Sequence, residues 1–309
     1  MAPRFQITCL GFATVDIIVE NGVRGDQKYL GGSAANVAAI LSFYGMESKF
    51  SGTVGNDSLG HFIVDQFDSF GVDTNLLVKL EDYRTPFCFE NIISKDGKYV
   101  THSFATSSPD KIENSSRYCC ILEYSREHLA FARDSRVIYV NRQDPILREI
   151  IGSDHFVFYD PEYIDDYSLH SWLCARADVL KYSHQQFIDF SHDVGEEARS
   201  LVIETFGHQG LSFRNGKSAW HYVSPCQNID QVDPTGAGDW FSAALIRQIT
   251  TAQTFQPHDW SIDQCVSYLK RAGQCAAEST RYKTALGKIL YDGCDECAVL
   301  EVGEGKSGL

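Results

Sequence analysis

The chain has 309 residues, of which 43% are hydrophobic and 22% are charged, the mixture of an ordinary globular protein that can bury a large core. It carries 27 Lys and Arg residues against 41 Asp and Glu residues, which gives a formal net charge of −14. This acidic excess disfavours nucleic acids and anionic membranes as partners, because both require a positively charged protein surface.

The ten cysteines are scattered along the chain and are too sparse for a disulfide scaffold, so we expect reduced thiols. The apolar run that ends at Gly11 is too short for the core of a signal peptide. No apolar stretch reaches the length needed to cross a bilayer. These features predict a cytoplasmic protein.

In the first part of the chain, short strand-like segments alternate with longer helical ones, a pattern typical of a mostly parallel sheet with helices on its faces. The Asp96-Gly97 step predicts a β-hairpin. In chain order we expect strand 5–10, helix 33–43, strand 50–54, helix 59–70, and the hairpin strands 86–93 and 98–104.

From residue 137 onward the alternation is clearer. The expected elements are strands 137–140, 156–159, 179–182 and 201–205, an antiparallel pair 211–213 and 218–223, and helices 236–249 and 262–279. Residues 106–117 read as a surface loop and 301–309 as a flexible tail. The sequence therefore predicts one α/β domain over residues 1–309, with a doubly wound, mostly parallel sheet flanked by helices.

The most informative string is Asp233-Pro-Thr-Gly-Ala-Gly-Asp239. Its small residues at 236–238 let the backbone approach a ligand closely, and the helix that follows directs unpaired N–H groups at an anion. Asp239 would lie in the first helical turn, where it could accept a hydroxyl proton. A glycine turn capped by Asp239 is the simpler alternative, but Asp233 and Thr235 beside it favour a functional site.

A second string, Gly31-Gly32-Ser-Ala-Ala-Asn36, also leads into an Ala-rich helix. The glycine pair would let a polar ligand touch the main chain, and the Asn36 amide both donates and accepts hydrogen bonds. Taken alone this pattern is weak, because a glycine pair before such a helix commonly serves tight packing.

Together the two strings resemble the ribokinase-like (PfkB) family of carbohydrate and nucleoside kinases. Other landmarks of the family occur in the same order, namely Asp16, Gly55-Asn-Asp57-Ser-Leu-Gly60, Gly71-Val-Asp73, Asp160-Pro161 and Thr205-Phe-Gly207-His-Gln-Gly210. The resemblance implies a ribokinase-like fold with a small β-sheet lid from about 14–30 and 86–104. The lid would close over the acceptor and exclude water.

The resemblance also implies an activity, the transfer of the γ-phosphoryl group of ATP, with Mg²⁺, to a hydroxymethyl group of a sugar. Asp239 would be the general base, and the amides of Gly236, Ala237 and Gly238 would form the anion hole. The substrate hydroxyls would be held by Asp16, Gly31, Gly32 and Asn36. The ATP side would consist of Ser183, Thr205, Gly207, Gly210, Asp233 and Thr235, the last two near the phosphates or a monovalent cation such as K⁺.

Several residues depart from the family pattern. Ser183 replaces an Asn, and Gln186 replaces the Glu that helps to hold Mg²⁺, so the metal ligands stay unassigned. Glu162 replaces an Asn that many sugar kinases carry, and Thr284 replaces a Gly at the adenine pocket. The bulky Trp240 after the base predicts a narrowed acceptor pocket or an unusual substrate.

Three functions remain open on the sequence alone. The first is a sugar kinase of the ribokinase or fructokinase type. The second is a nucleoside kinase of the same family, with an aromatic slot from Phe12, Phe87, Phe89 and Phe104. The third is a weakly active regulatory protein that binds a sugar or nucleotide. A homodimer through the lid is also expected, because exposed strand edges tend to pair.

Overall fold

The protein is described by a computed structural model that covers residues 6–95, 98–105, 119–121, 123–185, 200–226 and 229–291. Gln186, the loop expected at 106–117, the Asp96-Gly97 turn and the tail at 301–309 lie outside these ranges. Within the described ranges, no helix combines the length and the apolar character needed to span a membrane.

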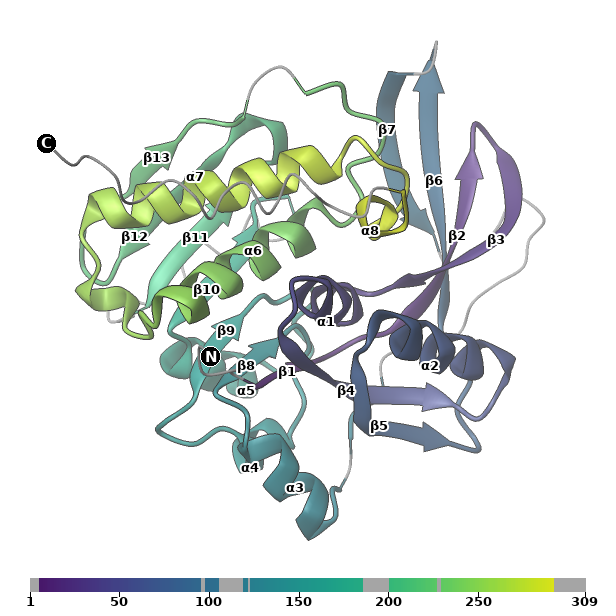
Figure 1. Cartoon of the computed structure of the whole chain (residues 1–309), viewed down its shortest axis with the longest axis horizontal. Coiled ribbons are helices and arrows are strands. Elements are labelled where there is room, and N and C mark those ends of the chain that lie inside the picture. Colours follow the sequence, from purple (N-terminus) through teal and green to yellow (C-terminus); the bar gives the residue numbers. More distant parts are fainter. Residues whose placement is uncertain are drawn as a thin grey trace, which may run out of the picture.

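A large, mostly parallel sheet forms the centre of the molecule (Figure 1). In the described part of the chain it has nine strands in the order β13-β12-β11-β10-β9-β8-β1-β4-β5, and only the pairs β11–β12 and β12–β13 are antiparallel. The strands are β1 (Gln6–Leu10), β4 (Glu47–Gly55), β5 (Asp73–Leu80), β8 (Val137–Val140), β9 (Phe156–Tyr159), β10 (Val179–Ser183), β11 (Leu201–Thr205), β12 (Leu211–Asn215) and β13 (His221–Val223).

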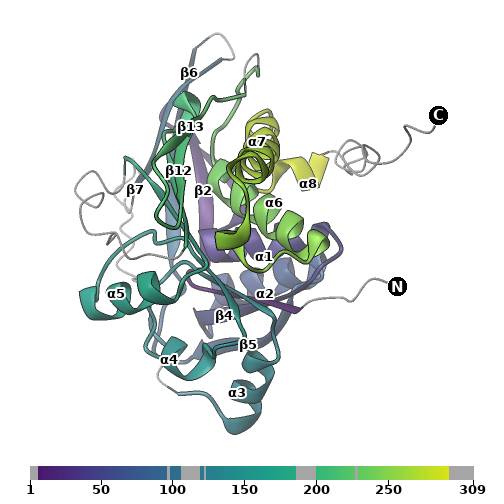
Figure 2. The ribbon, with the colours of Figure 1, turned by 90° about the vertical axis from the view of Figure 1, so that its left-hand side faces the viewer.

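Helices cover both faces of this sheet (Figure 2). One face packs against α1 (Ser33–Phe43), α2 (Ser58–Phe70), α6 (Ala237–Ala252) and α7 (Ile262–Ser279). The other packs against α3 (Arg126–Arg133), α4 (Leu147–Ile150) and α5 (Tyr167–Arg176). The short α8 (Gly287–Tyr291) and the 3₁₀ turns η2 (Gly207–Gln209) and η3 (Pro257–Asp259) complete the described elements.

This two-sided cover explains the composition of the central strands. Every residue of β8 and of β9 is buried, because a parallel strand with helices on both faces has no side in water. On one face the α1 segment is rich in Ala and is buried from Ala34 to Leu41, so the helix can approach the sheet closely. The predicted doubly wound α/β fold is confirmed.

A second, smaller sheet projects from the large one (Figure 1). Its order is β3-β2-β6-β7, and its strands are β2 (Thr14–Glu20), β3 (Val23–Gly31), β6 (Phe87–Lys95) and β7 (Lys98–Ala105). The inner pair β2–β6 is parallel and both outer pairs are antiparallel. It is therefore built from the two segments in which the sequence resemblance places a lid.

Some elements differ from the sequence prediction. Strand β5 and helix α5 were not predicted, and the strand expected at 218–223 is confined to His221–Val223. The turn after β12 extends further than expected because the Ser218 hydroxyl accepts a hydrogen bond from the Asn215 N–H at 2.9 Å. Ser218 therefore belongs to the turn.

Asp57 joins the start of α2 to the segment before β6. Its carboxylate accepts hydrogen bonds from the N–H groups of Leu59 (3.1 Å), Gly60 (2.8 Å) and Thr85 (2.9 Å). Burial raises the pKa of the carboxyl group, but these hydrogen bonds outweigh it and leave the pKa of Asp57 below its ordinary value. Asp57 of the Gly-x-Asp-x-x-Gly landmark is thus a structural cap.

We predict that Asp57→Ala lowers the free energy of unfolding by about 1–2 kcal/mol, since three N–H groups lose their acceptor. Urea unfolding at several pH values would measure it. Because the folded-state pKa is depressed, the contribution of Asp57 is present above the unfolded-state pKa and is lost as the pH falls through the folded-state pKa. Asp65→Ala, at an exposed position of the same helix, is the control, and an equal loss in both variants would contradict the prediction.

Candidate active site

Polar residues gather where the parallel strands of the large sheet end. Ser183 and Thr205, both predicted for the ATP side, are the last residues of β10 and β11, while Asp160 of the family landmark follows β9 and the unpredicted Asn141 follows β8. In open α/β sheets this edge is where ligands bind. The first turns of α1 and α6 meet at the same edge, as the following contact shows.

Asp239 lies in the first turn of α6 and contacts α1. Its Oδ2 accepts a hydrogen bond of 2.8 Å from Nδ2 of Asn36. The helix begins after Gly236, which has a left-handed φ of 75°, and a Cβ at that position would overlap Ala285. Only glycine fits there, so the chain can turn sharply and direct the start of α6 at the site.

The Asp239 carboxyl group is buried, with 7% of the residue exposed. Burial raises its pKa to about 7, and the carboxylates of Asp160 and Glu162 add to the rise. The Asn36 hydrogen bond and the charge of Lys181 act in the opposite direction. A carboxyl group in this state gains and loses its proton near neutral pH, as a general base requires.

Asp16 reaches the same site from the small sheet. A Cβ on Gly31 would overlap its carboxylate, and a Cβ on Gly32, whose φ is 90°, would overlap the carbonyl oxygen of Phe12. Burial, followed by the charges of Glu162, Asp239 and Asp233, raises the pKa of Asp16 to about 7. The four residues expected on the substrate side are Asp16, Gly31, Gly32 and Asn36, and the structure brings them together.

Several acceptor oxygens in this region are buried and have no hydrogen-bond partner among the described residues. They include Oδ1 of Asp16, Asn36 and Asn141 and Oε2 of Glu90 and Glu162. Asn141 was not predicted, and its Nδ2 donates to the main-chain oxygen of Asp160 at 3.3 Å. Since an unsatisfied buried acceptor is costly, these atoms are suited to a ligand that donates hydrogen bonds.

Lys181 is a further residue that the sequence did not reveal as part of the site. Its Nζ donates to Oδ2 of Asp160 at 2.5 Å and to the carbonyl oxygen of Gly238 at 3.3 Å. Asp160 also accepts hydrogen bonds from Tyr139 and Ser242. This buried network holds the turn at Gly238 against β10, and a lysine within a buried strand was its only sequence signal.

The loop before α6 is held by Asp233, whose carboxylate accepts hydrogen bonds from the N–H groups of Thr235 (2.9 Å) and Thr284 (2.8 Å). The Thr235 hydroxyl donates to Glu90 of the small sheet. Burial, with the charges of Asp233 and Asp16, raises the pKa of Glu90 to about 10. Thr284 has a left-handed φ of 72°, which explains why glycine suits that position.

Among the predicted anion-hole amides, the Ala237 N–H donates to the Pro234 carbonyl at 3.1 Å. The residues predicted for the ATP side lie at the ends of neighbouring strands, since Ser183 pairs with Thr205 across β10 and β11. Gly207 begins the turn η2 and Gly210 follows it, with positive φ values of 57° and 92°.

Trp240 does not narrow the acceptor pocket, and that prediction is wrong. The side chain is fully buried, and its ring packs edge-on against the rings of Phe43 and Tyr44, with distances between ring centroids of 6.3 Å and 6.0 Å. Its Nε1–H donates to the carbonyl oxygen of Ala285 at 2.8 Å. On a helix, neighbouring residues point about 100° apart, so Trp240 faces the core while Asp239 faces the site.

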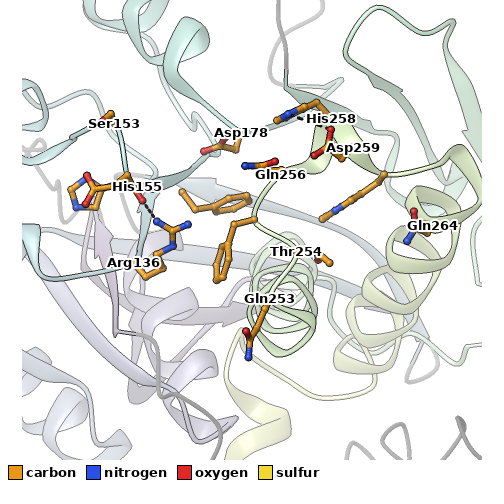
Figure 3. Close-up of a pocket in the computed structure, with 14 residues that line it drawn as sticks. Arg136, Ser153, His155, Asp178, Gln253, Thr254, Gln256, His258, Asp259 and Gln264 are labelled. Atoms are coloured by element: carbon orange, nitrogen blue, oxygen red, sulfur yellow. Dashed lines mark hydrogen bonds and ion pairs between the residues drawn. The ribbon is translucent and has the colours of Figure 1, made fainter.

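A pocket of about 620 Å³ lies at the opposite edge of the large sheet (Figure 3). Arg136 and Asp178, which precede β8 and β10, line it together with residues after α6 such as Thr254 and His258. It is thus at the amino ends of the strands, away from Asp239, and is not the candidate active site.

We predict that Asn36→Ala raises the pKa of Asp239 above its value of about 7, because the hydrogen bond that favours the carboxylate is lost. The pKa can be followed by ¹³C NMR of labelled Asp carboxyl groups, with Asp239→Asn to assign the signal. Asn75→Ala, an exposed position on β5, should leave the pKa unchanged. An unchanged or lower pKa in Asn36→Ala would show that the Asn36 contact has no electrostatic effect on Asp239.

The chain is similar to known carbohydrate kinases in both sequence and fold. A family model described as "pfkB family carbohydrate kinase" matches residues 6–114 and 173–286. A fructokinase from Vibrio alginolyticus is 25% identical over 91% of this chain and 94% of its own length. An ATP-dependent 6-phosphofructokinase from Thermoanaerobacterium thermosaccharolyticum is 27% identical over 82% of this chain and 85% of its own length. The crystal structure of a fructokinase with bound ATP from Xylella fastidiosa has a similar fold, with a TM-score of 0.71, 21% identity and coverage of 91% and 93% of the two chains.

Proposed function

Since the chain belongs to the pfkB family of carbohydrate kinases, phosphotransferases that act on an alcohol group, we propose that it transfers the γ-phosphoryl group of ATP to a hydroxymethyl group of a sugar, with Asp239 as the general base. The family resemblance drawn from the sequence motifs is thereby confirmed. The observation that carries the residue assignment is the buried Asp239 carboxyl group at the start of α6, bonded to Asn36.

In the proposed reaction, the Asp239 carboxylate accepts the proton of the acceptor hydroxyl as the hydroxyl oxygen attacks the γ-phosphorus of ATP. The bond between the γ-phosphorus and the β,γ-bridging oxygen breaks, and ADP leaves. The pKa of about 7 keeps a substantial fraction of Asp239 ionised at neutral pH and still makes it a stronger base than an ordinary carboxylate. Asn36 orients the carboxylate through Oδ2. Asp239 remains protonated until it returns the proton to solvent.

The turn at Gly236, Ala237 and Gly238 is proposed to stabilise the charge on the transferring group. Main-chain N–H groups at the start of a helix donate hydrogen bonds to phosphate oxygens. Because these groups are fixed in place, they can stabilise the charge that develops on the transferring phosphoryl group without any movement of side chains. The Ala237 N–H donates to Pro234 in this structure, so that amide would have to exchange its partner when the phosphate binds. Lys181 holds the turn through the carbonyl oxygen of Gly238.

The substrate hydroxyls are proposed to bind Asp16 and Asn36, with the main chain of Gly31 and Gly32 as the adjacent wall. The unpartnered oxygens of Asp16 and Asn36 suit the donor character of a sugar hydroxyl. The small sheet would act as the lid over this site. A closed lid excludes water, which otherwise competes with the sugar for the phosphoryl group.

The nucleotide is proposed to bind along Ser183, Thr205, Gly207 and Gly210. Among the described residues, no group of three or more His, Cys, Asp or Glu side chains could hold a metal ion. Mg²⁺ is proposed to be held mainly by phosphates and water, where it would neutralise phosphate charge. The Asp233 carboxylate and the unpartnered Thr284 hydroxyl carry oxygen atoms that could coordinate a monovalent cation such as K⁺ near Thr235.

We predict that Asp239→Asn lowers kcat by about 10²–10⁴-fold, the usual contribution of a general base, and leaves the affinity for ATP nearly unchanged. ADP release measures the rate, and calorimetric titration measures ATP binding. Asp259→Asn, an exposed change of the same type, is the control. Equal rates in Asp239→Asn and the parent protein would remove Asp239 from the base role.

Two other functions are less well supported. A nucleoside kinase would need an aromatic slot, but Phe89 is fully buried and Phe87 packs against it edge-on at 5.6 Å, while the guanidinium of Arg142 lies over the Phe12 ring at 5.1 Å. These rings are engaged in protein contacts. A weakly active regulatory protein would have no use for a buried carboxyl group poised to accept a proton.

We predict ADP release with a free hexose or pentose when a panel of sugars and nucleosides is assayed in the presence of Mg²⁺ and K⁺. Omitting each ion in turn tests the two cofactor assignments. Turnover with nucleosides alone would support the second function. Binding of sugar or ATP without ADP release in every case would support the third and would contradict the proposal.

The homodimer through the lid and the cytoplasmic location stay predictions. Val23 of β3, Ile93 of β6 and Phe104 of β7 are exposed apolar side chains on the small sheet, and they support the idea that this sheet contacts another subunit.

A further inference from the structure

Acidic side chains dominate the acceptor end of the candidate site. Asp16 comes from β2, Asp239 from the start of α6, and Glu162 from the segment after β9. Glu162 is tied to the acceptor side by its ion pair with Arg142, whose guanidinium lies over the ring of Phe12. The carbonyl oxygen of Phe12 in turn lies against Gly32. In keeping with this position, the charge of Glu162 raises the pKa of both Asp16 and Asp239. A phosphate dianion that entered this region would meet several like charges in a poorly solvated place.

Among the described residues, two cationic side chains, Lys181 and Arg142, lie near these carboxylates, and each is already paired. Lys181 binds Asp160 at 2.5 Å. Arg142 binds Glu162 with an Nη2–Oε2 distance of 3.2 Å, and its guanidinium lies over the rings of Phe12 and Tyr163. Each cation is thus neutralised by its own carboxylate.

Most of the unpartnered buried polar atoms that the structure describes around the site are acceptors; the exception is Nε of Arg142, whose guanidinium is already ion-paired with Glu162. The unpartnered oxygens of Asp16, Asn36 and Asn141 require donors, and a sugar hydroxyl supplies one. A phosphate group at neutral pH offers mainly acceptor oxygens, so it would add like charge and leave these atoms unsatisfied.

We propose that Glu162 is a specificity-determining residue: by neutralising Arg142 beside the acceptor site, it restricts the reaction to sugars that carry no phosphate group. This inference rests on the proposed function. Family membership leaves the point open, because one relative is named a fructokinase and another a 6-phosphofructokinase. Glu162 was noted in the sequence only as a departure from the family pattern.

The test compares kcat/KM for the best free sugar of the panel with that for its monophosphates that keep a hydroxymethyl group. For fructose these are the 1-phosphate and the 6-phosphate. We expect a preference for the free sugar of about 100-fold or more, since like charges at a binding site are strongly unfavourable.

The variant Glu162→Gln removes the charge and keeps the shape of the side chain. It should lower the preference for the free sugar by about 10-fold or more, because the Arg142 guanidinium becomes able to bind a phosphate. The double variant Glu162→Gln/Arg142→Gln should restore most of the preference. Glu127→Gln, at an exposed position of α3, makes the same change of charge and should have no effect.

A second readout separates this role from a merely structural one. Since Glu162 raises the pKa of Asp239, Glu162→Gln should move the acidic limb of the kcat profile for the free sugar to lower pH. The other groups that act on Asp239 include Asn36, Lys181 and Asp160, together with Asp16, whose carboxyl group interacts with that of Asp239, and they are unchanged in the variant. Thermal unfolding establishes that each variant is folded.

The outcomes distinguish the inference from the proposed function. If free sugar and sugar phosphate are phosphorylated equally well, or the phosphate better, the kinase assignment holds and the inference is overturned. An unaltered preference in folded Glu162→Gln overturns the role of Glu162. If no sugar of either kind is phosphorylated, the proposed function is wrong and the inference is overturned with it.

Discussion

The contact between Asn36 and Asp239 is the interaction on which the candidate site depends. It joins the first turns of two helices whose residues are 203 positions apart in the chain. Apolar packing of α1 and α6 in one core cluster sets the distance between the helices, but apolar contacts are not directional. The buried hydrogen bond is directional, and it fixes the orientation of the Asp239 carboxylate relative to the glycine pair that precedes α1.

The same burial that makes Asp239 a better base is costly for the fold. A buried carboxyl group needs hydrogen bonds or a nearby cation if it is to ionise, and Asn36 and Lys181 supply these. Lys181 is itself buried and is compensated by Asp160. The charge of Asp239 is thus compensated by Lys181, and the charge of Lys181 by Asp160. This network explains why polar side chains occur on otherwise apolar strands.

Sequence patterns predicted the parts of this structure that depend on local chemistry. Alternating strands and helices, the glycine turn before α6 and the glycine pair before α1 are all visible as runs of residue types. Lys181, Asn141 and Glu90 were not predicted, because their roles come from partners distant in the chain. Trp240 was misjudged for the same reason, since only the packing of α6 against Phe43 and Tyr44 shows which way its ring points.

The small sheet is tied to the chemistry more closely than a simple cover would be. Asp16 on β2 lies against the backbone of Gly31, and Glu90 on β6 accepts a hydrogen bond from Thr235 in the loop before α6. The carboxylate proposed to bind substrate hydroxyls and the loop proposed to lie at the phosphates are thus both in contact with one sheet. Thr235 is also fixed by Asp233, so a displacement of the small sheet would strain the loop that positions Gly236 and Asp239. Under the proposed function, the placement of the acceptor would therefore be linked to the placement of the phosphate.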